Sequence, residues 1–564
     1  MRPRTFKRLL VLAALACAAW LGQRWYDAHS RLPAPDELVL ELPEPSSRLS
    51  IAIIPAGDRE PTPAELLEQR LAALAESIEE RRRQRGTPGL VDFDVEGLSS
   101  TLATILAKIG DAAQLSIHIR DLRTGHVLFD DYGDTPLNPA SNQKLLTSAA
   151  ALELLGPDYT FVTRVLRDDT ALYLVGEGDP QLSLLDLRAL ATETVAALDT
   201  TSVQRLIVDD SAFSHRMLPP GYDEGGPGLA YEAESCALSL GYNTVQITVA
   251  PAGSTVAVTT VPATKAIAIV NRARIGTRRT IAVRTFEREG DTVVEVTGKL
   301  PRRGPPTIVL RRIHDPARTT GTIFAEMLGE LSTSEPLSVV RGVAPPGAEE
   351  IARHESAILL EILDAELTWS NNFIAEQVLR TLAWRMTGEP GDWDAGQDIL
   401  RGYWSALGND PDQVVIENGS GLSRSGRLTT SGLVDLIAMA QRDAGGGPGL
   451  LDVLPVAGEE GTLRSRLRLS GKRVRAKTGT LRDVSGLTGV ITSEDGTPQI
   501  AFSILINAHD VALDSAKRRA IEDGIVTATL AALDDYEARL AGIVTGARPR
   551  GPSRAAAPAG RPRP

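Results

Sequence analysis

The sequence contains little cysteine, histidine and lysine. Among 564 residues there are 2 cysteines and 7 histidines, and only eight of the 60 basic residues are lysines. Cys17 lies in an apolar segment at the start of the chain, so we expect Cys236 to be a buried thiol that forms no internal disulfide. The histidines show neither the H-x-x-x-H nor the H-E-x-x-H spacing of zinc sites, so we expect no metal and no other cofactor.

Between its two ends, the chain also lacks net positive charge. Its formal net charge is −12, although residues 1–8 hold four basic residues and residues 548–564 hold five arginines, with no acid in either segment. Residues 9–547 therefore carry a charge of −21. Because nucleic-acid binding needs clustered basic charge, we expect no nucleic-acid partner. The length allows two to four domains, and a hydrophobic fraction of 42% is typical of a globular protein.

The first apolar run is too short to be an ordinary transmembrane span. It extends from Leu9 to about Trp20 behind a basic start, which is typical of a signal peptide at residues 1–22. Ala16-Cys17-Ala18 offers a cleavage site, while an uncleaved anchor or a lipid-modified Cys17 would tether the chain to the membrane. We expect export to the periplasm or cell envelope, with the form of the N-terminus left open.

Composition and periodicity divide the rest of the chain into segments. Residues 23–62 read as a proline-rich linker, and Thr62, Pro63 and Glu65 have the capping signature of a helix that opens an N-terminal helical segment at 63–111. Residues 536–564 combine the end of a last helix with a tail rich in arginine, proline and alanine, which we expect to be disordered.

The central pattern mixes strands and helices. Alternation predicts a hairpin at 115–129, and residues from about 160 to 310 read mostly as strands, with helices near 184–198 and 318–332. Helical periodicity dominates 355–407 and 429–442. Three strands follow, near 473–478, 486–492 and 499–506.

One short polar motif places a nucleophile beside a base. Ser141-Asn142-Gln143-Lys144 leads into a helix rich in alanine and leucine. Residues three apart share a helix face, so Ser141 Oγ and Lys144 Nζ can meet. A serine hydroxyl needs a neighbouring base before it attacks a carbonyl, and a neutral lysine amine can serve. Taken alone, the motif also fits a helix-capping serine beside an exposed lysine.

Two further motifs complete a set. Ser370-Asn371-Asn372 lies between two helical runs, and Lys477-Thr478-Gly479 follows an alternating strand. Alone, the former fits a helix break and the latter a strand end. In this order, however, Ser-x-x-Lys, Ser-x-Asn and Lys-Thr-Gly form the motif set of penicillin-binding proteins and class A β-lactamases. The three motifs together therefore predict a serine acyl-transfer site.

Lysine usage supports this interpretation independently. Both motif bases are lysines in a chain whose basic residues are mostly arginine. Arginine cannot release its proton in a protein, whereas a buried lysine can. Two ammoniums about 4 Å apart repel by about 4 kcal/mol at an effective dielectric of 20, enough to lower one lysine pKa by roughly three. We expect Lys144, nearer the helix and less exposed, to be the neutral amine.

From about residue 112 to 535 the sequence resembles the D-alanyl-D-alanine carboxypeptidase/endopeptidases of the penicillin-binding protein 4 type, the class C low-molecular-mass penicillin-binding proteins. The likeness extends beyond the motifs to NPASNQK, GEGDPQL, NGSGLSR and AKTGTL. It implies an α+β fold of the serine β-lactamase/DD-peptidase type, in which helices flank an antiparallel sheet. The 225 residues between Lys144 and Ser370 fit the inserted domains of that family. The implied layout is a peptidase domain at 112–165 and 345–535 around inserted β-rich domains at 166–344.

The resemblance implies hydrolysis of peptidoglycan stem peptides through an acyl-serine intermediate, with inhibition by penicillins and other β-lactams. Ser141 would attack the peptide carbonyl between two D-alanines while Lys144 takes its proton. Ser370 would relay a proton to the leaving amine, and Asn372 would hold the substrate amide.

The third motif would bind the end of the substrate. Lys477 and Thr478, with Gly479 and Thr480, would hold the terminal carboxylate, and the backbone N–H groups of Ser141 and Thr480 would form the oxyanion hole.

One position departs from the family and two functional alternatives stand beside the main prediction. Asn418 replaces the usual Asp before Gly-Ser-Gly, which leaves a backbone-turn role but no charge there. The alternatives are a penicillin-recognising binding or scaffold protein with little hydrolysis, and a β-lactamase or esterase on the same fold. Carboxypeptidase and endopeptidase activity are both compatible with the motifs.

Overall fold

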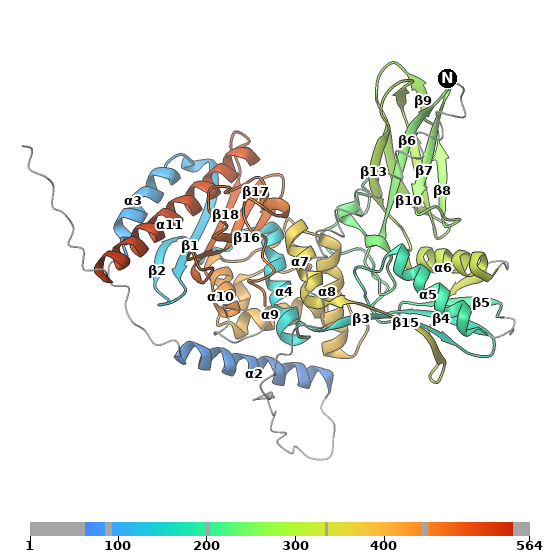
Figure 1. Ribbon diagram of the computed structural model, residues 1–564, viewed down its shortest axis with the longest axis horizontal. Helices are drawn as coiled ribbons and strands as arrows, with labels where there is room; N and C mark the ends of the chain where they lie inside the picture. The colour runs from blue at the N-terminus through green and yellow to red at the C-terminus, as the bar shows by residue number, and fades with distance from the viewer. Residues whose placement is uncertain (1–61, 85–92, 199–202, 333–336, 442–448, 545–564) are drawn as a thin grey trace, which may run out of the picture. The chain divides into compact units, whose positions relative to one another are not determined.

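The computed structural model of the chain describes residues 62–84, 93–198, 203–332, 337–441 and 449–544 (Figure 1). The expected signal segment, almost all of the proline-rich linker and the arginine-rich tail lie outside these residues. Within the described ranges, no helix is both long and apolar enough to span a bilayer.

The first strands of the chain pair with the last ones. A five-stranded sheet has the order β16-β17-β18-β1-β2, and all of its neighbours are antiparallel. Ile117 of β1 lies opposite Ile504 of β18, so segments almost 400 residues apart form one sheet. The predicted hairpin and three final strands are confirmed, with bounds β1 Ala113–Asp121, β2 Val127–Asp131, β16 Val474–Thr480, β17 Val484–Thr492 and β18 Pro498–Ala508.

Helices cover both faces of this sheet, because its central strands are apolar on both sides. Every residue of β17 is buried. On one face, Ile117, Leu487 and Ile504 share a core with α3 and α11; on the other, Val490 and Leu505 share a core with α4 and α7–α10. The predicted antiparallel sheet flanked by helices is confirmed, with bounds α3 Val95–Leu106, α4 Gln143–Leu154, α7 Leu359–Trp369, α8 Asn372–Thr387, α9 Trp393–Ala406, α10 Thr430–Ala440 and α11 Ser515–Val544.

The inserted region begins with a second five-stranded sheet, of order β14-β5-β4-β3-β15. Its strands β4, β5 and β14 are parallel, and α5 and α6 share a core with the sheet. The expected domain boundaries at 165 and 345 fall within β3 and just before β15. Residues 355–358, which were expected to be helical, form the end of β15. The bounds are β3 Thr160–Arg167, β4 Ala171–Gly176, α5 Leu184–Ala197, β5 Arg205–Asp209, α6 Pro316–Ser332, β14 Ser338–Arg341 and β15 Glu349–Ile358.

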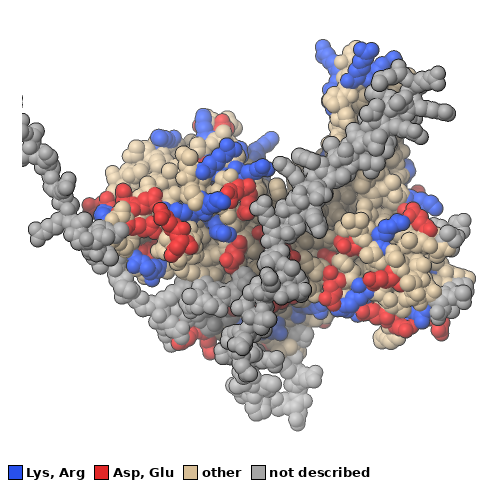
Figure 2. Space-filling view, viewed as in Figure 1, with Lys and Arg blue, Asp and Glu red and all other residues tan. Residues whose placement is uncertain are grey.

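Short strands between β5 and α6 form a third core. They pair as β13-β6-β7, β10-β11-β8 and β12-β9 around valines and isoleucines. Figure 2 shows lysine and arginine side chains gathered at the end of this lobe. In the strand pair β12-β9, Arg274 lies in register with Lys299. The bounds are β6 Thr244–Ala252, β7 Thr255–Val261, β8 Ile267–Asn271, β9 Arg274–Gly276, β10 Ala282–Arg288, β11 Asp291–Thr297, β12 Lys299–Pro301 and β13 Thr307–Arg312.

The N-terminal helix α2, Pro63–Gln84, packs on the peptidase-type domain. The Thr62 backbone N–H donates to Glu65 Oε2 at 2.7 Å and the Glu65 N–H donates to Thr62 Oγ1 at 3.3 Å, which confirms the predicted capping box. Leu67 packs against the apolar cluster of Met386 and Ile399. The helix is therefore packed on one side.

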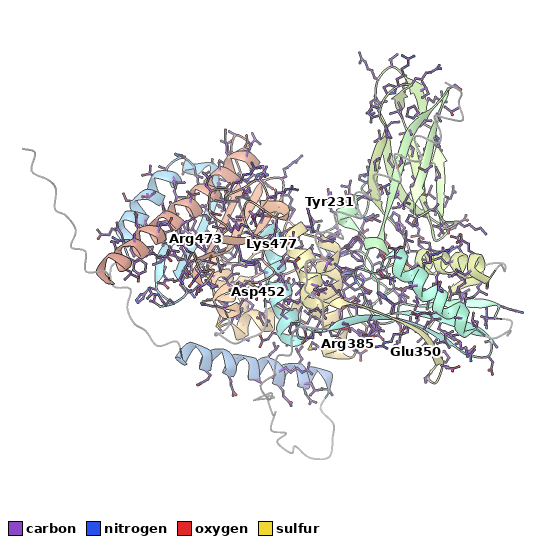
Figure 3. The ribbon with its side chains drawn as sticks, in the orientation of Figure 1. Tyr231, Glu350, Arg385, Asp452, Arg473 and Lys477 are labelled. Atoms are coloured by element: carbon purple, nitrogen blue, oxygen red, sulfur yellow. The ribbon has the colours of Figure 1, made fainter. Side chains whose placement is uncertain are left out.

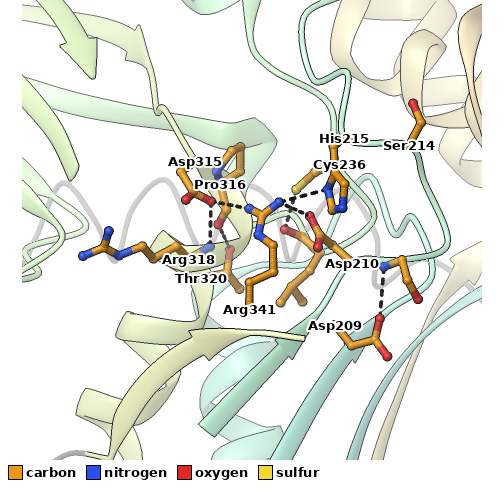
Figure 4. Close-up of polar contacts among 12 residues, drawn as sticks. Asp209, Asp210, Ser214, His215, Cys236, Asp315, Pro316, Arg318, Thr320 and Arg341 are labelled. Carbon is orange, nitrogen blue, oxygen red and sulfur yellow. Dashed lines mark hydrogen bonds and ion pairs between the residues drawn. The ribbon is translucent and has the colours of Figure 1, made fainter. Parts of the chain in front are cut away.

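An ionic cluster joins the elements of the second sheet. Figure 4 shows Arg341, at the end of β14, between Asp210, Asp315 and His215. Its guanidinium nitrogens lie 3.2 Å from Asp210 Oδ2 and 2.6 Å from Asp315 Oδ1. Cys236 is buried nearby as predicted, and burial raises the pKa of its thiol to about 12.

Arg380 connects the inserted region to α8. Its side chain is fully buried and lies between the rings of Phe213 and Trp393, at 4.6 and 4.3 Å from their centroids. The guanidinium donates to the carbonyls of Ser214 at 2.6 Å, Ser235 at 2.5 Å and Gly391 at 3.1 Å. Burial lowers its pKa to about 10. Three loop carbonyls therefore depend on one buried cation.

We predict that Arg380→Met lowers the free energy of unfolding by about 3 kcal/mol or more, because it leaves the Ser214 and Ser235 carbonyls without donors and removes one of the two donors to the Gly391 carbonyl. The matched control is Arg401→Met, since Arg401 pairs with Asp398 on the surface of α9 and such pairs contribute about 0.5 kcal/mol. Denaturant unfolding followed by circular dichroism measures both; equal effects of the two substitutions would contradict this role.

Candidate active site

A strained turn presents Ser141 at the start of α4. Ala140 has a left-handed φ of +46°, which is uncommon for a residue with a Cβ. Its N–H donates to Asn138 Oδ1 at 2.9 Å, and the Asn138 N–H donates to Asn507 Oδ1 at 2.9 Å. A Cβ on Gly421 would lie 2.0 Å from the Ala140 carbonyl oxygen, so this turn requires a glycine beside it. The turn is thereby held from both β18 and the 418–424 loop.

Lys144 lies beneath Ser141 and is fully buried. Its Nζ lies 3.3 Å from Ser141 Oγ, donates to Asn372 Oδ1 at 2.8 Å and donates to the Ser420 carbonyl at 2.7 Å. These contacts come from three separate parts of the chain. The two residues predicted from the first motif therefore meet, and Asn372 of the second motif joins them.

Ser370 occupies the break between α7 and α8. It has a left-handed φ of +56° and ends α7, while the Asn371 side chain caps α8 by accepting the Ile374 N–H at 3.2 Å. The Asn372 Nδ2 donates to the Tyr231 carbonyl of the inserted region at 3.0 Å. The predicted helix break is confirmed, and its strained conformation turns the serine side chain toward Lys477.

Lys477 lies on β16, at the edge of the sheet. Its side chain is fully buried, and its Nζ donates to Ser370 Oγ at 2.8 Å and to the Thr478 carbonyl at 2.7 Å. The Thr478 hydroxyl bonds the Thr462 hydroxyl at 2.8 Å, and Thr480 is exposed at the strand end. Figure 3 locates Lys477 on β16 and Tyr231 in the inserted region.

Gly479 allows β16 to approach the nucleophile turn. A Cβ at this position would lie 2.7 Å from both Asn142 Nδ2 and the Pro139 carbonyl oxygen. Such contacts are too short for a real side chain, so the strand would have to move away. The close approach explains why the third motif ends in glycine.

Burial, rather than repulsion between the lysines, is the main cause of their altered pKa values. Desolvation lowers the pKa of Lys144 to about 8, against the opposing charges of Glu366 and Glu376. Desolvation, and then the charge of Lys144, lowers the pKa of Lys477 well below its usual value. Both side chains are fully buried, so the expectation that Lys144 is the less exposed of the two is wrong.

Glu376 is a site residue that the motif analysis missed. This fully buried carboxylate, one turn after Asn372, accepts the N–H groups of Gly419 at 3.0 Å and Ser420 at 2.9 Å. It thereby holds the loop whose Ser420 carbonyl contacts Lys144. Its signal in the sequence is an acid among the apolar residues of α8.

Asn418 forms the turn that this loop needs. Its Oδ1 accepts the Gly421 N–H at 2.8 Å, and its Nδ2 donates to the Pro220 carbonyl at 2.8 Å. The predicted backbone-turn role is confirmed. The amide also connects the loop to the inserted region, which a carboxylate could not do by donation.

The described residues contain no cluster of three or more His, Cys, Asp or Glu side chains arranged to hold a metal. What they bring together is a serine hydroxyl beside a lysine amine, a second serine–lysine pair and an open strand edge. This constellation can carry out acyl transfer on a carbonyl with serine as nucleophile.

Comparison with known proteins agrees with that class. Residues 98–531 match the profile of the D-Ala-D-Ala carboxypeptidase 3 (S13) family. The D-alanyl-D-alanine carboxypeptidase of Actinomadura sp. (strain R39) is 34% identical over 458 residues, which cover 75% of this chain and 84% of that protein. The carboxypeptidase DacB of Mycolicibacterium smegmatis is 27% identical, with 74% and 83% covered. The chain therefore belongs to the D-Ala-D-Ala carboxypeptidase 3 (S13) family.

Solved structures share the fold. The crystal structure of penicillin binding protein 4 (dacB) from Haemophilus influenzae superposes with a TM-score of 0.63 at 21% identity, covering 75% of this chain and 97% of that one. The same protein complexed with a β-lactam gives a TM-score of 0.61 at 20% identity, with the same coverage. The expected fold class, with its insertions, is thus confirmed.

We predict that Gly479→Ala lowers the rate of Ser141 acylation at least tenfold, because the added methyl group displaces β16 and Lys477 from the turn at Ala140. A fluorescent penicillin measures the rate. The matched control is Gly524→Ala in α11, where the nearest atom to the new Cβ is Ile105 Cδ1 at 3.7 Å. That change should keep the rate and raise stability by up to about 1 kcal/mol. An unchanged rate in Gly479→Ala would contradict the close-approach argument.

Proposed function

We propose that this D-Ala-D-Ala carboxypeptidase cleaves the D-Ala-D-Ala ends of peptidoglycan stem peptides through an acyl intermediate on Ser141, and that penicillins acylate the same serine. The observation that carries the proposal is the meeting of two serine–lysine pairs in one site. Ser141 Oγ lies 3.3 Å from Lys144 Nζ, and Ser370 Oγ lies 2.8 Å from Lys477 Nζ.

Substrate binding determines which of the two lysines is protonated. Two ammoniums in one buried site repel each other, so the free site favours a single positive charge. The terminal carboxylate of the substrate binds to Lys477 and Thr478, with Gly479 and Thr480 beside them. The negative charge stabilises the ammonium of Lys477 and leaves Lys144 as the neutral base.

Acylation begins when Ser141 Oγ attacks the carbonyl of the penultimate D-alanine and its proton passes to Lys144 Nζ. The N–H groups of Ser141 and Thr480 stabilise the negative oxygen of the tetrahedral intermediate. As the C–N bond breaks, Ser370 donates its hydroxyl proton to the leaving amine and recovers one from Lys477. Lys144 then passes its proton to the neutral Lys477, so both amines regain their starting states. Water next attacks the acyl-serine and gives a proton to Lys144, which returns it to Ser141 Oγ as the acyl C–O bond breaks.

The edge of β16 is arranged to align the substrate backbone. Residues 455–457 already pair with its first half, through the Ala476 N–H to the Pro455 carbonyl at 3.2 Å and the Ala457 N–H to the Val474 carbonyl at 2.9 Å. The second half, Lys477–Thr480, is left facing the nucleophile turn. The Asn372 amide, whose Oδ1 accepts from Lys144 Nζ at 2.8 Å, holds the substrate amide.

Endopeptidase activity uses the same steps. Carboxypeptidase and endopeptidase reactions both cleave beside a D-alanine and differ only in the leaving amine. We further propose that the protein acts outside the cytoplasm, in the periplasm or cell envelope. The basic start and apolar run Leu9–Trp20 support export, as a cleaved signal, a lipidated end or an anchor.

We predict that Ser141→Ala abolishes both covalent labelling by fluorescent penicillin and release of D-alanine from a pentapeptide muropeptide, with a loss of at least about 1,000-fold. Mass spectrometry of the wild-type adduct should place the acyl group on Ser141. Labelling of the wild type without D-alanine release would favour a binding protein, and rapid penicillin turnover would favour a β-lactamase. Unchanged release by Ser141→Ala would overturn the assignment.

We predict that the acylation rate rises with pH through about 8, because Lys144 must be neutral to accept the serine proton and its pKa is lowered to about 8. Lys144→Arg should remove acylation at every pH, since arginine keeps its proton. Stopped-flow measurements with penicillin test this; a flat profile between pH 6 and 9 would contradict it.

A further inference from the structure

Glu366 is a buried carboxylate with few partners. It lies on α7, one turn before Ser370, and has no solvent exposure. The Ser148 hydroxyl is 3.5 Å from its Oε1, which is a weak hydrogen bond, and its Oε2 has no hydrogen-bond partner. A buried carboxylate oxygen without a donor destabilises the fold unless its charge interacts favourably with other groups.

Helix geometry places this carboxylate beside the two lysines. Ser148 lies one turn after Lys144 on α4, so the two side chains share a face. Glu366 and Ser370 have the same spacing on α7, and Ser370 contacts Lys477. The carboxyl group therefore lies behind both serine–lysine pairs, on the side away from solvent.

The charged groups that act on one another here come from four elements: Lys144 of α4, Glu366 of α7, Glu376 of α8 and Lys477 of β16. All four side chains are fully buried. The Glu376 carboxylate accepts hydrogen bonds from the Trp393 indole N–H at 2.8 Å and from two loop N–H groups, whereas Glu366 has no such donors.

We propose that Glu366 is a positioning residue for acyl transfer, whose negative charge sets the protonation of Lys144 and Lys477 and hence the pH range of activity. This inference rests on the proposed function of the site. Once the pH exceeds the Glu366 pKa of about 8, the ammonium that forms when Ser141 gives its proton to Lys144 interacts with an ionised carboxylate. No atom of Glu366 touches the substrate.

The electrostatic directions agree with this role. The charge of Glu366 raises the pKa of both lysines. Burial raises the pKa of Glu366 to about 8, and the charges of the two lysines act in the opposite direction. Removal of the carboxylate charge should therefore lower both lysine pKa values. The rising limb of the pH–rate profile depends on Lys144, so this limb should move to lower pH.

The test is the pH dependence of Ser141 acylation by penicillin in the full chain. Glu366→Gln keeps the size of the side chain and should shift the rising limb to lower pH by about one unit. Ser148→Ala removes a hydroxyl that favours the ionised carboxylate, so it should shift the rising limb in the same direction by less. Ser148→Ala also keeps the test decisive if Glu366→Gln does not fold.

A matched control is Glu522→Gln. Glu522 lies on α11, and its fully buried carboxylate pairs with Arg466 at 2.8 Å. It should lower the melting temperature without moving the rising limb. An unshifted rising limb in both Glu366→Gln and Ser148→Ala, with only a lower rate, would overturn the inference while leaving the proposed function intact. Failure of the proposed function is separately visible as activity that survives Ser141→Ala.

Discussion

Two lysine amines are buried in one site, and the rest of the arrangement follows from that constraint. An ammonium loses a large hydration energy on burial, so each amine must find acceptors or give up its proton. Lys144 finds Asn372 and the Ser420 carbonyl, while Lys477 finds Ser370 and the Thr478 carbonyl. The strain at Ala140 and Ser370 is the cost of bringing serine hydroxyls to these amines, and the surrounding helices and sheet maintain it.

The fold supplies this site from elements that are distant in sequence. The nucleophile turn is fixed by Asn507 on β18, the Ser420 carbonyl by Glu376, and Asn372 by a carbonyl of the inserted region. The inserted region is therefore part of the support of the site, since Tyr231 and Pro220 both accept hydrogen bonds from amides of the peptidase-type domain. Arg380 provides the same connection deeper in the molecule.

The reactive side chains were predictable because their chemistry restricts residue type and spacing. Ser141 and Lys144 had to share a helix face, and only lysine among the basic residues could serve as base. The hairpin at 115–129 and the last three strands were predictable from alternation. Their union into one domain was implied only by the family resemblance, because local periodicity carries no information on long-range pairing. Glu366 and Glu376 were missed because an acid among the apolar residues of a helix is only a weak sign that its carboxylate is buried. The α/β character of the sheet formed by β4, β5 and β14 was missed because parallel pairing depends on the whole insertion.

The scarcity of lysine allows the central claim to be measured directly. With eight lysines in the chain, protein labelled with ¹³C at lysine Cε should give few enough NMR signals to follow each through a pH titration, with Lys144→Arg and Lys477→Arg for assignment. The account predicts that Lys144 titrates near 8 and Lys477 well below its ordinary value. Titration of both site lysines near the ordinary lysine value of about 10.4 would contradict it.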